Sequence, residues 1–426
     1  MELPIPSDLR HRTLQALTVR KAAGPREQLL EAPSIGEIHG ALAAIGADAL
    51  VYLTPGTATT PGSALIVRSG QAPSQLPLHQ LRIEPGGELD AYAYALGALG
   101  GPADDGTKTG RDRWRAALAR LHPWSWRVAM GPLLAETATW ELGRPPWLVL
   151  APAGQLGLVP WHAASTSAAG RTRHALEEAT LSSTPSARLL CDVARRGTAV
   201  RNGRAFVLGN PTGDLPYAAR EAHQVLDAFY PDGVYMGRDP SGTAVADGAP
   251  AEILAHMPSA EAPGMPVLHF ACHAVAVSEP PAGSHLRVGG SQRLTVERLL
   301  DHARGRDPDR PGPLVVLSAC TTDLPGQDYD EALTLATGFL VAGAASAVGS
   351  LWQVPDWRTA MLMFMFHHYV RQACMKPGTA LRAAQLWMLD TDREPPEGMP
   401  PELACRSGEA GLADPGAWAA FVHRGW

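Results

Sequence analysis

The chain has 426 residues, of which 45% are apolar, and this is enough to bury more than one sizeable core. Charged residues make up 18%, the formal net charge is −6, and no run of Lys or Arg gives an electrostatic footprint for nucleic acid. The five cysteines are an odd number, and residues 1–4 lack the basic-then-apolar pattern of an export signal. These features predict a cytoplasmic protein without a disulfide framework.

One uncharged stretch, residues 332–355, is long enough to cross a bilayer on length alone. Gly338, Gly343 and Gly349 interrupt it, with Ala and Ser between them, so its mean hydropathy is low. Its second half is typical of a strand that is buried on both faces. The sequence therefore predicts a buried helix followed by a buried strand here, and no membrane partner.

Before residue 145 the chain predicts a region of mixed character. Residues 1–34 are polar and interrupted by Pro, and we expect an N-terminal extension. Apolar runs at 49–53 and 64–67 predict a β-hairpin, because a turn rich in Thr, Pro and Gly separates them. A helical stretch over 114–134 follows and ends before a pair of prolines.

From residue 145 onwards, predicted strands and helices alternate. Strands are predicted at 147–150, 205–208, 267–271, 314–317 and 345–352, and helices at 218–229, 331–343, 358–373 and 379–389. Such alternation is typical of an α/β fold, a mostly parallel sheet with helices on both faces. The Pro- and Gly-rich residues 391–416 predict a long surface loop.

Two of the predicted strands end in reactive side chains. His273 follows the strand in VLHFACHA, and Cys320 follows the strand in LVVLSACTT, 47 residues later. Catalytic groups gather beyond the carboxyl ends of parallel strands, and a thiol needs a base such as imidazole to become a thiolate. Caspases also place the histidine about 50 residues before the cysteine. We therefore predict a cysteine nucleophile paired with a histidine base.

Other kinds of site have less support. Cys272, beside His273, is expected to point into the core, since neighbouring strand residues alternate in direction. His269 and His273 would lie about 13 Å apart along a strand, too far to share a metal ion. There is no phosphate-binding glycine loop, dinucleotide fingerprint or GxSxG elbow. The sequence thus predicts no metal and no other cofactor, and it argues against a serine hydrolase.

These segments resemble the CHAT domains, caspase-like cysteine peptidases of clan CD. The matching stretches are LVLAPAGQLGLVPWHAA (148–164), VLGNPTGDLPYAAREA (207–222), LHFACHA (268–274), LVVLSACTT (314–322), DEALTLATGFLVAGAASAVGSLWQVPD (330–356) and DPGAWAAFVHRG (414–425). The resemblance implies a caspase-like, mostly parallel sheet flanked by helices. It also implies a degenerate, pseudo-caspase half over 35–144 and a CHAT peptidase domain over 145–426.

Residue by residue, the resemblance implies that Cys320 is the nucleophile and His273 the general base. The backbone N–H groups of Ala274 and Cys320 would form the oxyanion hole. CHAT domains usually have Gly where this chain has Ala274, and Ala disfavours a positive φ. We therefore expect low or conditional activity if the turn after the histidine needs a positive φ.

The resemblance also implies a peptide substrate, bound as an added strand. Arg- or Lys-specific members of the clan often have an acid two residues before the nucleophile, where this chain has the neutral Ser318. Asp330 is the nearest alternative acid, although it is equally suited to the first turn of a helix. Trp352 and Asp356 follow the next strand end, and we expect them to line the substrate groove. The neutral Ser318 favours a pocket for an apolar residue such as Leu over one for Arg or Lys.

The combined hypothesis is a bacterial, cytoplasmic cysteine endopeptidase that acts as a conditionally activated effector in defence or cell-death signalling. Its substrate would be a protein, and a separately encoded activating or regulatory protein is the expected partner. Residues 1–34 or the degenerate half are alternative sources of control. The alternative hypothesis is a catalytically silent CHAT scaffold that binds a partner protein.

Overall fold

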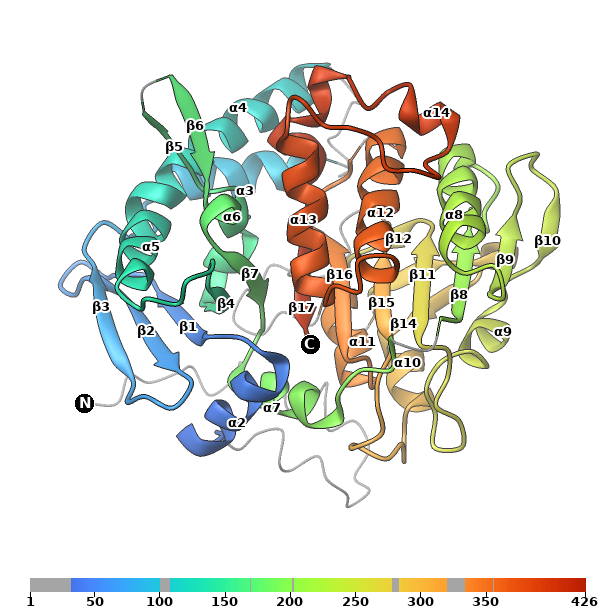
Figure 1. Ribbon diagram of the computed structural model, residues 1–426, viewed down its shortest axis with the longest axis horizontal. Helices are drawn as coiled ribbons and strands as arrows, with labels where there is room; N and C mark the ends of the chain where they lie inside the picture. The colour runs from blue at the N-terminus through green and yellow to red at the C-terminus, as the bar shows by residue number, and fades with distance from the viewer. Residues whose placement is uncertain are drawn as a thin grey trace.

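The computed structural model describes residues 32–99, 108–168, 170–200, 203–277, 283–319, 334–354 and 356–426. One twelve-stranded sheet runs through this part of the chain (Figure 1). Its strands lie in the order β10 (Ala244–Ala246), β9 (Val234–Arg238), β8 (Ala205–Gly209), β11 (Val267–Ala271), β15 (Leu314–Leu317), β16 (Ser346–Ser350), β17 (Phe421–Gly425), β7 (Thr180–Ser183), β4 (Trp147–Pro152), β1 (Ala49–Thr54), β2 (Gly62–Arg68) and β3 (Ser74–Leu78).

The sheet has two parallel blocks. The first runs from β9 through β8, β11 and β15 to β16, and the second is formed by β7, β4 and β1. The β1–β2 and β2–β3 pairs at one end, and the β9–β10 pair at the other, are antiparallel. The sheet is therefore mostly parallel, as the resemblance implied, with antiparallel pairs at both ends.

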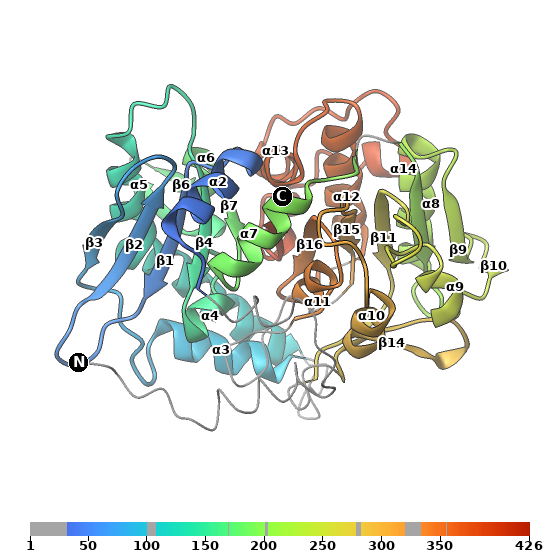
Figure 2. The same ribbon diagram turned by 90° about the horizontal axis from the view of Figure 1, so that it is seen from below.

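The strands of the first block are apolar because both of their faces are covered. In β8, Phe206 and Leu208 belong to one core and Ala205 and Val207 to another, as strand alternation requires. The helices over this block are α8 (Pro216–Phe229) and α12 (Asp356–Arg371) on the first face, and α9 (Pro250–Leu254), α10 (Val296–His302) and α11 (Leu335–Val341) on the second (Figures 1 and 2). Helix α13 (Pro377–Leu389) follows on the first face and packs against β7 and β17.

Helices also cover both faces of the second block. These are α2 (Ile35–Ile45) and α7 (Ala187–Arg196) on one face, and α3 (Glu88–Ala98), α4 (Lys108–Ser125), a π-helical turn (Trp126–Met130), α5 (Gly131–Ala138) and α6 (Ala175–Glu178) towards the other. Helix α2 shows how the sequence sets such ends. Ser34 and Glu37 form a capping box at its start, and Gly46 ends it with a φ of 79°.

Strand β17 joins the two blocks. Five of its residues pair with β16 in antiparallel register. Its parallel pairing with β7 consists of one residue pair, Arg424 opposite Ser183. The buried imidazole of His423 strengthens this seam. Its Nδ1 lies 2.7 Å from Oγ of Ser182 in β7, and its Nε2 lies 2.7 Å from Oγ of Ser346 in β16.

Two small sheets stand beside the main one. A three-stranded sheet follows β11 directly and consists of β12 (Ala274–Val275), β13 (His285–Arg287) and β14 (Arg293–Thr295). A hairpin of β5 (Ser165–Ala168) and β6 (Arg171–His174) lies between β4 and β7 in the chain. The first of these sheets places the residues after His273 at the carboxyl end of β11.

The predicted hairpin and the strand–helix alternation are confirmed. The uncharged stretch contains α11 and β16, as expected, although α11 begins at Leu335 and residues 331–333 lie outside the described part. The expected loop at 391–416 contains short helices, α14 (Pro401–Ala404) and the start of α15 (Pro415–Trp418). No helix in the described ranges has the length and apolar character that a membrane crossing requires.

Candidate active site

His273 lies two residues beyond the end of β11, and its imidazole contacts a carboxylate. Nε2 of His273 is 3.0 Å from Oδ2 of Asp214, which belongs to the loop between β8 and α8. Since β8 and β11 are parallel neighbours, their carboxyl ends meet at the same edge of the sheet. The fold therefore brings together two residues that are 59 positions apart.

Asn210 shapes the loop that presents Asp214. It is buried and takes a left-handed conformation with a φ of 46°, which Asn tolerates better than most residues. Its Oδ1 accepts hydrogen bonds from the backbone N–H of Gly213 (3.0 Å) and Leu215 (2.8 Å). Its own N–H donates to the carbonyl of Ala271 at 2.9 Å, and this bond fixes the loop to the end of β11.

The Asp214 carboxylate is ionised and orients the imidazole. The Thr212 hydroxyl donates to Oδ1, and this bond, with the contact to His273, holds the pKa of Asp214 below its usual range. An ionised carboxylate only accepts hydrogen bonds, so Nε2 of His273 carries the hydrogen of this pair. In the neutral imidazole, Nδ1 is then the basic nitrogen.

Ala274 is extended, and the departure from Gly causes no strain at this position. It belongs to β12 and is not among the described non-glycine residues with a positive φ. The N–H of Arg287 donates to the carbonyl of His273, so the Ala274–Leu286 pair is of the kind that exchanges no hydrogen bonds. The N–H of Ala274 thus points away from β13, on the edge side of β12.

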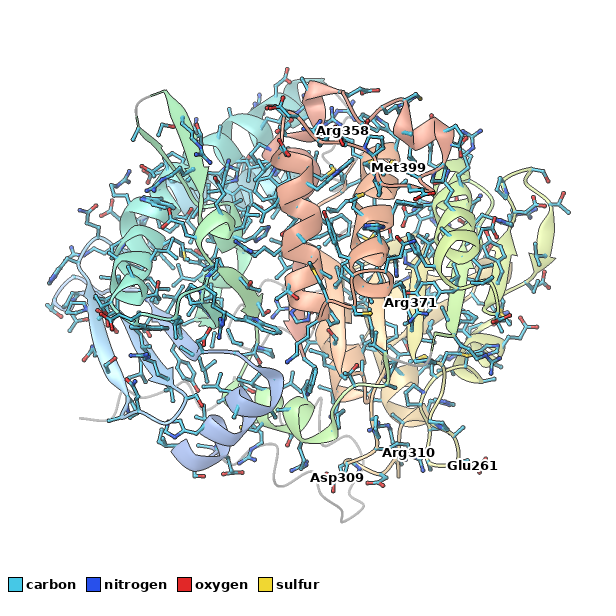
Figure 3. The ribbon with its side chains drawn as sticks, in the orientation of Figure 1. Glu261, Asp309, Arg310, Arg358, Arg371 and Met399 are labelled. Atoms are coloured by element: carbon cyan, nitrogen blue, oxygen red, sulfur yellow. The ribbon has the colours of Figure 1, made fainter. Side chains whose placement is uncertain are left out.

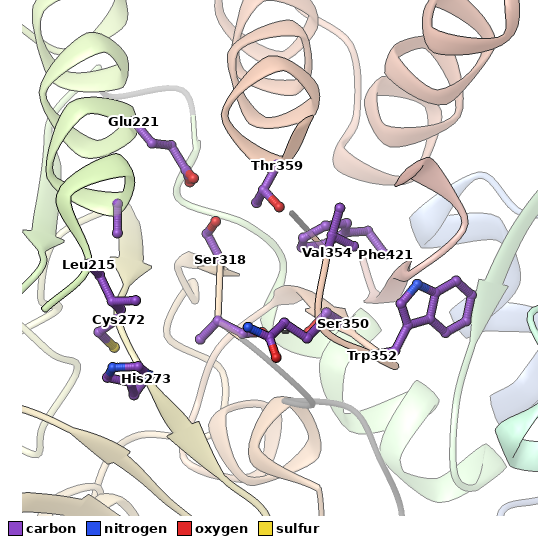
Figure 4. A pocket seen from close by; sticks show the side chains of 13 residues that line it. Leu215, Glu221, Cys272, His273, Ser318, Ser350, Trp352, Val354, Thr359 and Phe421 are labelled. Atoms are coloured by element: carbon purple, nitrogen blue, oxygen red, sulfur yellow. Dashed lines mark hydrogen bonds between the residues drawn. The ribbon is translucent and has the colours of Figure 1, made fainter. Parts of the chain in front are cut away.

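A pocket of about 60 Å³ opens beside His273 (Figure 4). Its lining comes from the carboxyl ends of β11, β15 and β16 and from α8, α12 and β17: Leu215, Ala218, Glu221, Cys272, His273, Ser318, Ala319, Ser350, Trp352, Gln353, Val354, Thr359 and Phe421. Cys272 is buried in the core, as predicted, and its side chain also contributes to this wall.

The structure places two of the four predicted substrate-binding residues on the pocket wall. Ser318 is 8% exposed, and its Oγ has no hydrogen-bond partner among the described residues. Trp352 is buried: its Nε1 donates to the carbonyl of Gly416, and its ring lies edge-on to Trp114. Trp352 is therefore mainly a core residue, and part of its side chain lines the pocket.

The remaining predicted residues are not placed. Cys320 and Asp330 lie outside the described residues, as does the side chain of Asp356, whose backbone begins α12. Ala319, which directly precedes Cys320, does line the pocket. The predicted nucleophile thus follows a pocket residue in the chain.

Sequence reasoning missed a buried polar network behind the pocket. Oε1 of Glu221 is 3.1 Å from Nε2 of His269, and Nδ1 of His269 is 3.1 Å from Nε2 of His367. The hydroxyl of Tyr230 lies 2.9 Å from Nδ1 of His367, and Arg371 (labelled in Figure 3) stacks over the Tyr230 ring. Glu221, His269, His367 and Tyr230 are each at most 3% exposed. They therefore form a buried series of hydrogen bonds that begins at the pocket.

One signal for the missed residues was present in the sequence. Asp214 and Glu221 both lie in the stretch 207–222, which carries the resemblance to CHAT domains, but nothing in its spacing paired them with a histidine. No group of three His, Cys, Asp or Glu side chains suited to a metal ion occurs in the described ranges.

The protein is thus an α/β protein with a mostly parallel sheet and a histidine beyond the carboxyl end of a central strand. The sequence model of the CHAT domain matches residues 120–426, so the chain belongs to the CHAT domain family. None of the curated proteins compared with the chain matches it.

Solved structures of similar fold include two crystal structures of the Saccharomyces cerevisiae separase–securin complex. The TM-scores are 0.58 and 0.56, with 9% and 10% sequence identity, and 91% of this chain is covered in both. Gingipain R of Porphyromonas gingivalis, an Arg-specific cysteine proteinase, gives a TM-score of 0.42 at 10% identity, covering 70% of this chain and 66% of its own. This chain spans only 30% and 31% of the matched chains in the separase complexes.

Proposed function

We propose that this protein is a cysteine endopeptidase in which Cys320 is the nucleophile and His273 the general base. The observation that carries the proposal is the His273–Asp214 pair at the carboxyl end of β11, on the wall of a pocket that also includes Ala319. Nucleophilic catalysis by cysteine needs a base within reach of the thiol, often oriented by a third group. His273 is oriented by Asp214 and shares the pocket wall with Ala319, the residue that precedes Cys320, which supports this arrangement.

The reaction follows from these roles. Nδ1 of His273 takes the thiol proton of Cys320, and the thiolate attacks the carbonyl carbon of the scissile peptide bond. The imidazolium then protonates the leaving amine, and the C–N bond breaks to leave a thioester on Cys320. Water, deprotonated by His273, hydrolyses the thioester and regenerates the thiol.

The developing oxyanion would be stabilised by the N–H groups of Ala274 and Cys320. The direction of the Ala274 N–H, away from β13, supports this role, since a donor used within the strand pair would not be available to substrate. The extended backbone of Ala274 supports an oxyanion hole that alanine can form as well as glycine.

The regulation and setting of the enzyme are also proposals. We infer a conditionally activated protease with a protein substrate and a separate regulatory protein, acting in the bacterial cytoplasm in defence or cell death. The family membership and the likeness to a fold solved in complex with securin support a protein partner.

Labelling by a peptidyl chloromethyl ketone, followed by intact mass and peptide mapping, tests the catalytic pair. We expect one adduct, on Cys320, in the wild type, none in Cys320→Ala, and a severe loss of rate in His273→Ala. Cys272→Ala is the matched control, because it removes the neighbouring thiol, and it should label normally. An adduct that persists in Cys320→Ala and disappears in Cys272→Ala would show that the assignment is wrong.

A further inference from the structure

Three polar side chains gather at one end of the pocket. Glu221 extends from α8, Thr359 from α12, and Ser318 from the chain just after β15, and Figure 4 shows their oxygens turned towards a common space. Each of the three residues is no more than 8% exposed. His273 lies at the other end in the same view, so the pocket leads from the base to a buried polar end.

The carboxyl group at this end accepts a hydrogen bond from the buried network, since Oε1 of Glu221 lies 3.1 Å from Nε2 of His269. A consistent set of donors then runs towards the pocket: Tyr230 O–H to His367, His367 N–H to His269, and His269 N–H to Glu221. Burial lowers the pKa of His367 well below its usual value, which agrees with a neutral imidazole in the middle of this chain.

The polar end has unused hydrogen-bond capacity. Of the two carboxyl oxygens of Glu221, only Oε1 contacts His269, and no described residue forms a hydrogen bond with Oε2. Oγ of Ser318 is buried and also has no partner among the described residues. Because a buried polar atom without a partner is costly, a ligand that donates a hydrogen bond to Oγ of Ser318 gains more here than at the surface, and Oε2 of Glu221 can accept a second one.

The chemistry of the pocket lining restricts the ligand further. The pocket of about 60 Å³ has the carboxyl group of Glu221 and the hydroxyl groups of Ser318 and Thr359 at one end. A side chain tipped with a cation that also donates hydrogen bonds suits these acceptors. Lys and Arg are the protein side chains with these properties.

We propose that Glu221 determines substrate specificity, by pairing with a basic side chain, Lys or Arg, of the residue on the acyl side of the scissile bond. This inference rests on the proposed peptidase function. It replaces the expectation of an apolar pocket, which considered only Ser318 and Asp330. Ser318 lines the same pocket, but the carboxylate belongs to Glu221 on α8, a helix that the fold packs beside the strand end that carries Ser318.

Peptidyl acyloxymethyl ketones that differ only in the acyl-side residue test the inference on the wild-type protein. The residues are Lys, Arg, norleucine and ε-acetyl-Lys, and the measurement is the rate constant for labelling Cys320. We expect Lys or Arg to label at least about tenfold faster than the two neutral residues, because a desolvated charge pair forms only with a cation. This comparison needs no variant, so a misfolded mutant cannot obscure it.

Glu221→Gln adds a second measurement, since it keeps the shape and removes the charge. We expect the preference for a basic residue to disappear, so that the ratio of the lysine to the norleucine labelling rate falls to about one. Asp227→Asn is the control, because it removes a charge from the exposed face of the same helix, and it should keep the preference.

The outcomes separate the two proposals. Labelling of Cys320 at equal rates by lysine and norleucine probes, or faster by norleucine, overturns the role of Glu221 and leaves the peptidase proposal standing. The four probes are also applied in a lysate of the native host, which supplies the proposed regulatory protein. Labelling of Cys320 by none of them there overturns the peptidase proposal, and the specificity inference with it.

Discussion

At the scale of single residues, Asp214 is the group whose role follows most directly from geometry. Its carboxylate accepts from Nε2 of His273 and keeps Nδ1 as the basic nitrogen. In Asp214→Asn the amide can donate to Nε2, which favours the wrong tautomer. We expect kcat to fall by at least about tenfold, with KM within about twofold of wild type, because the substrate pocket is untouched.

Steady-state kinetics on a cleaved peptide measure this effect, with Asp227→Asn as the matched control. A side chain that only stabilises the fold would lower the melting temperature and leave kcat unchanged in the folded fraction. An unchanged kcat in Asp214→Asn would therefore rule out the positioning role.

The position of His273 and Ser318 on the pocket wall could be predicted because each lies in a short motif at a strand end. Asp214 and Glu221 could not, since a carboxylate in a loop or on an amphipathic helix has ordinary roles in solvent and in capping. Only the parallel pairing of β8 with β11 brings them near histidines. The catalytic and substrate-binding roles of all the predicted site residues, including the unplaced Cys320, Asp330 and Asp356, stay predictions.

At the scale of elements, the loop between β8 and α8 depends on Asn210. Asn210→Ala removes the acceptor of two backbone N–H groups and puts a residue that disfavours the left-handed conformation at a φ of 46°. We expect a loss of about 1–3 kcal/mol in the free energy of unfolding, and lower activity because Asp214 is displaced. Asn210→Asp keeps the acceptor and tolerates the conformation, so it should retain most of both.

Urea unfolding of the two variants, together with kcat, makes the comparison. Equal stability of the alanine and aspartate variants would mean that the side-chain acceptor contributes little to the loop.

Strands that consist of continuous apolar residues, such as β8, β11 and β15, could be predicted with their bounds nearly correct. Strands β7 (TLSS) and β17 (FVHRG) could not, because their central positions are polar. Burial of Ser182 and His423 is possible since each supplies the hydrogen bond that the other needs. Such a mutual arrangement leaves no periodic pattern in either segment.

At the scale of the whole molecule, buried neutral histidines make stability depend on pH. Burial lowers the pKa of His122, His162 and His423 to about 3. In the unfolded chain these groups titrate near pH 6.5, so between pH 6.5 and 3 the unfolded state binds protons that the folded state does not. Their contribution is complete above pH 6.5 and is lost as the pH falls below it.

At pH 5 each of these histidines lowers the free energy of unfolding by roughly 2 kcal/mol relative to neutral pH. Together they remove a large part of a typical free energy of unfolding. We therefore expect the urea midpoint to fall steeply between pH 7 and pH 5. A midpoint that is constant over this range would contradict the buried neutral state of these histidines.

The place of β17 in the chain has a consequence for how the protein is made. Every other strand described in the twelve-stranded sheet precedes it, yet it lies between the two parallel blocks. During synthesis, the facing edges of β16 and β7 stay open until residues 421–425 have left the ribosome, and open strand edges invite association with other chains. The seam between the two blocks is therefore closed only after translation of this segment. A nascent chain that stops before residue 421 therefore has two open strand edges, one on β16 and one on β7.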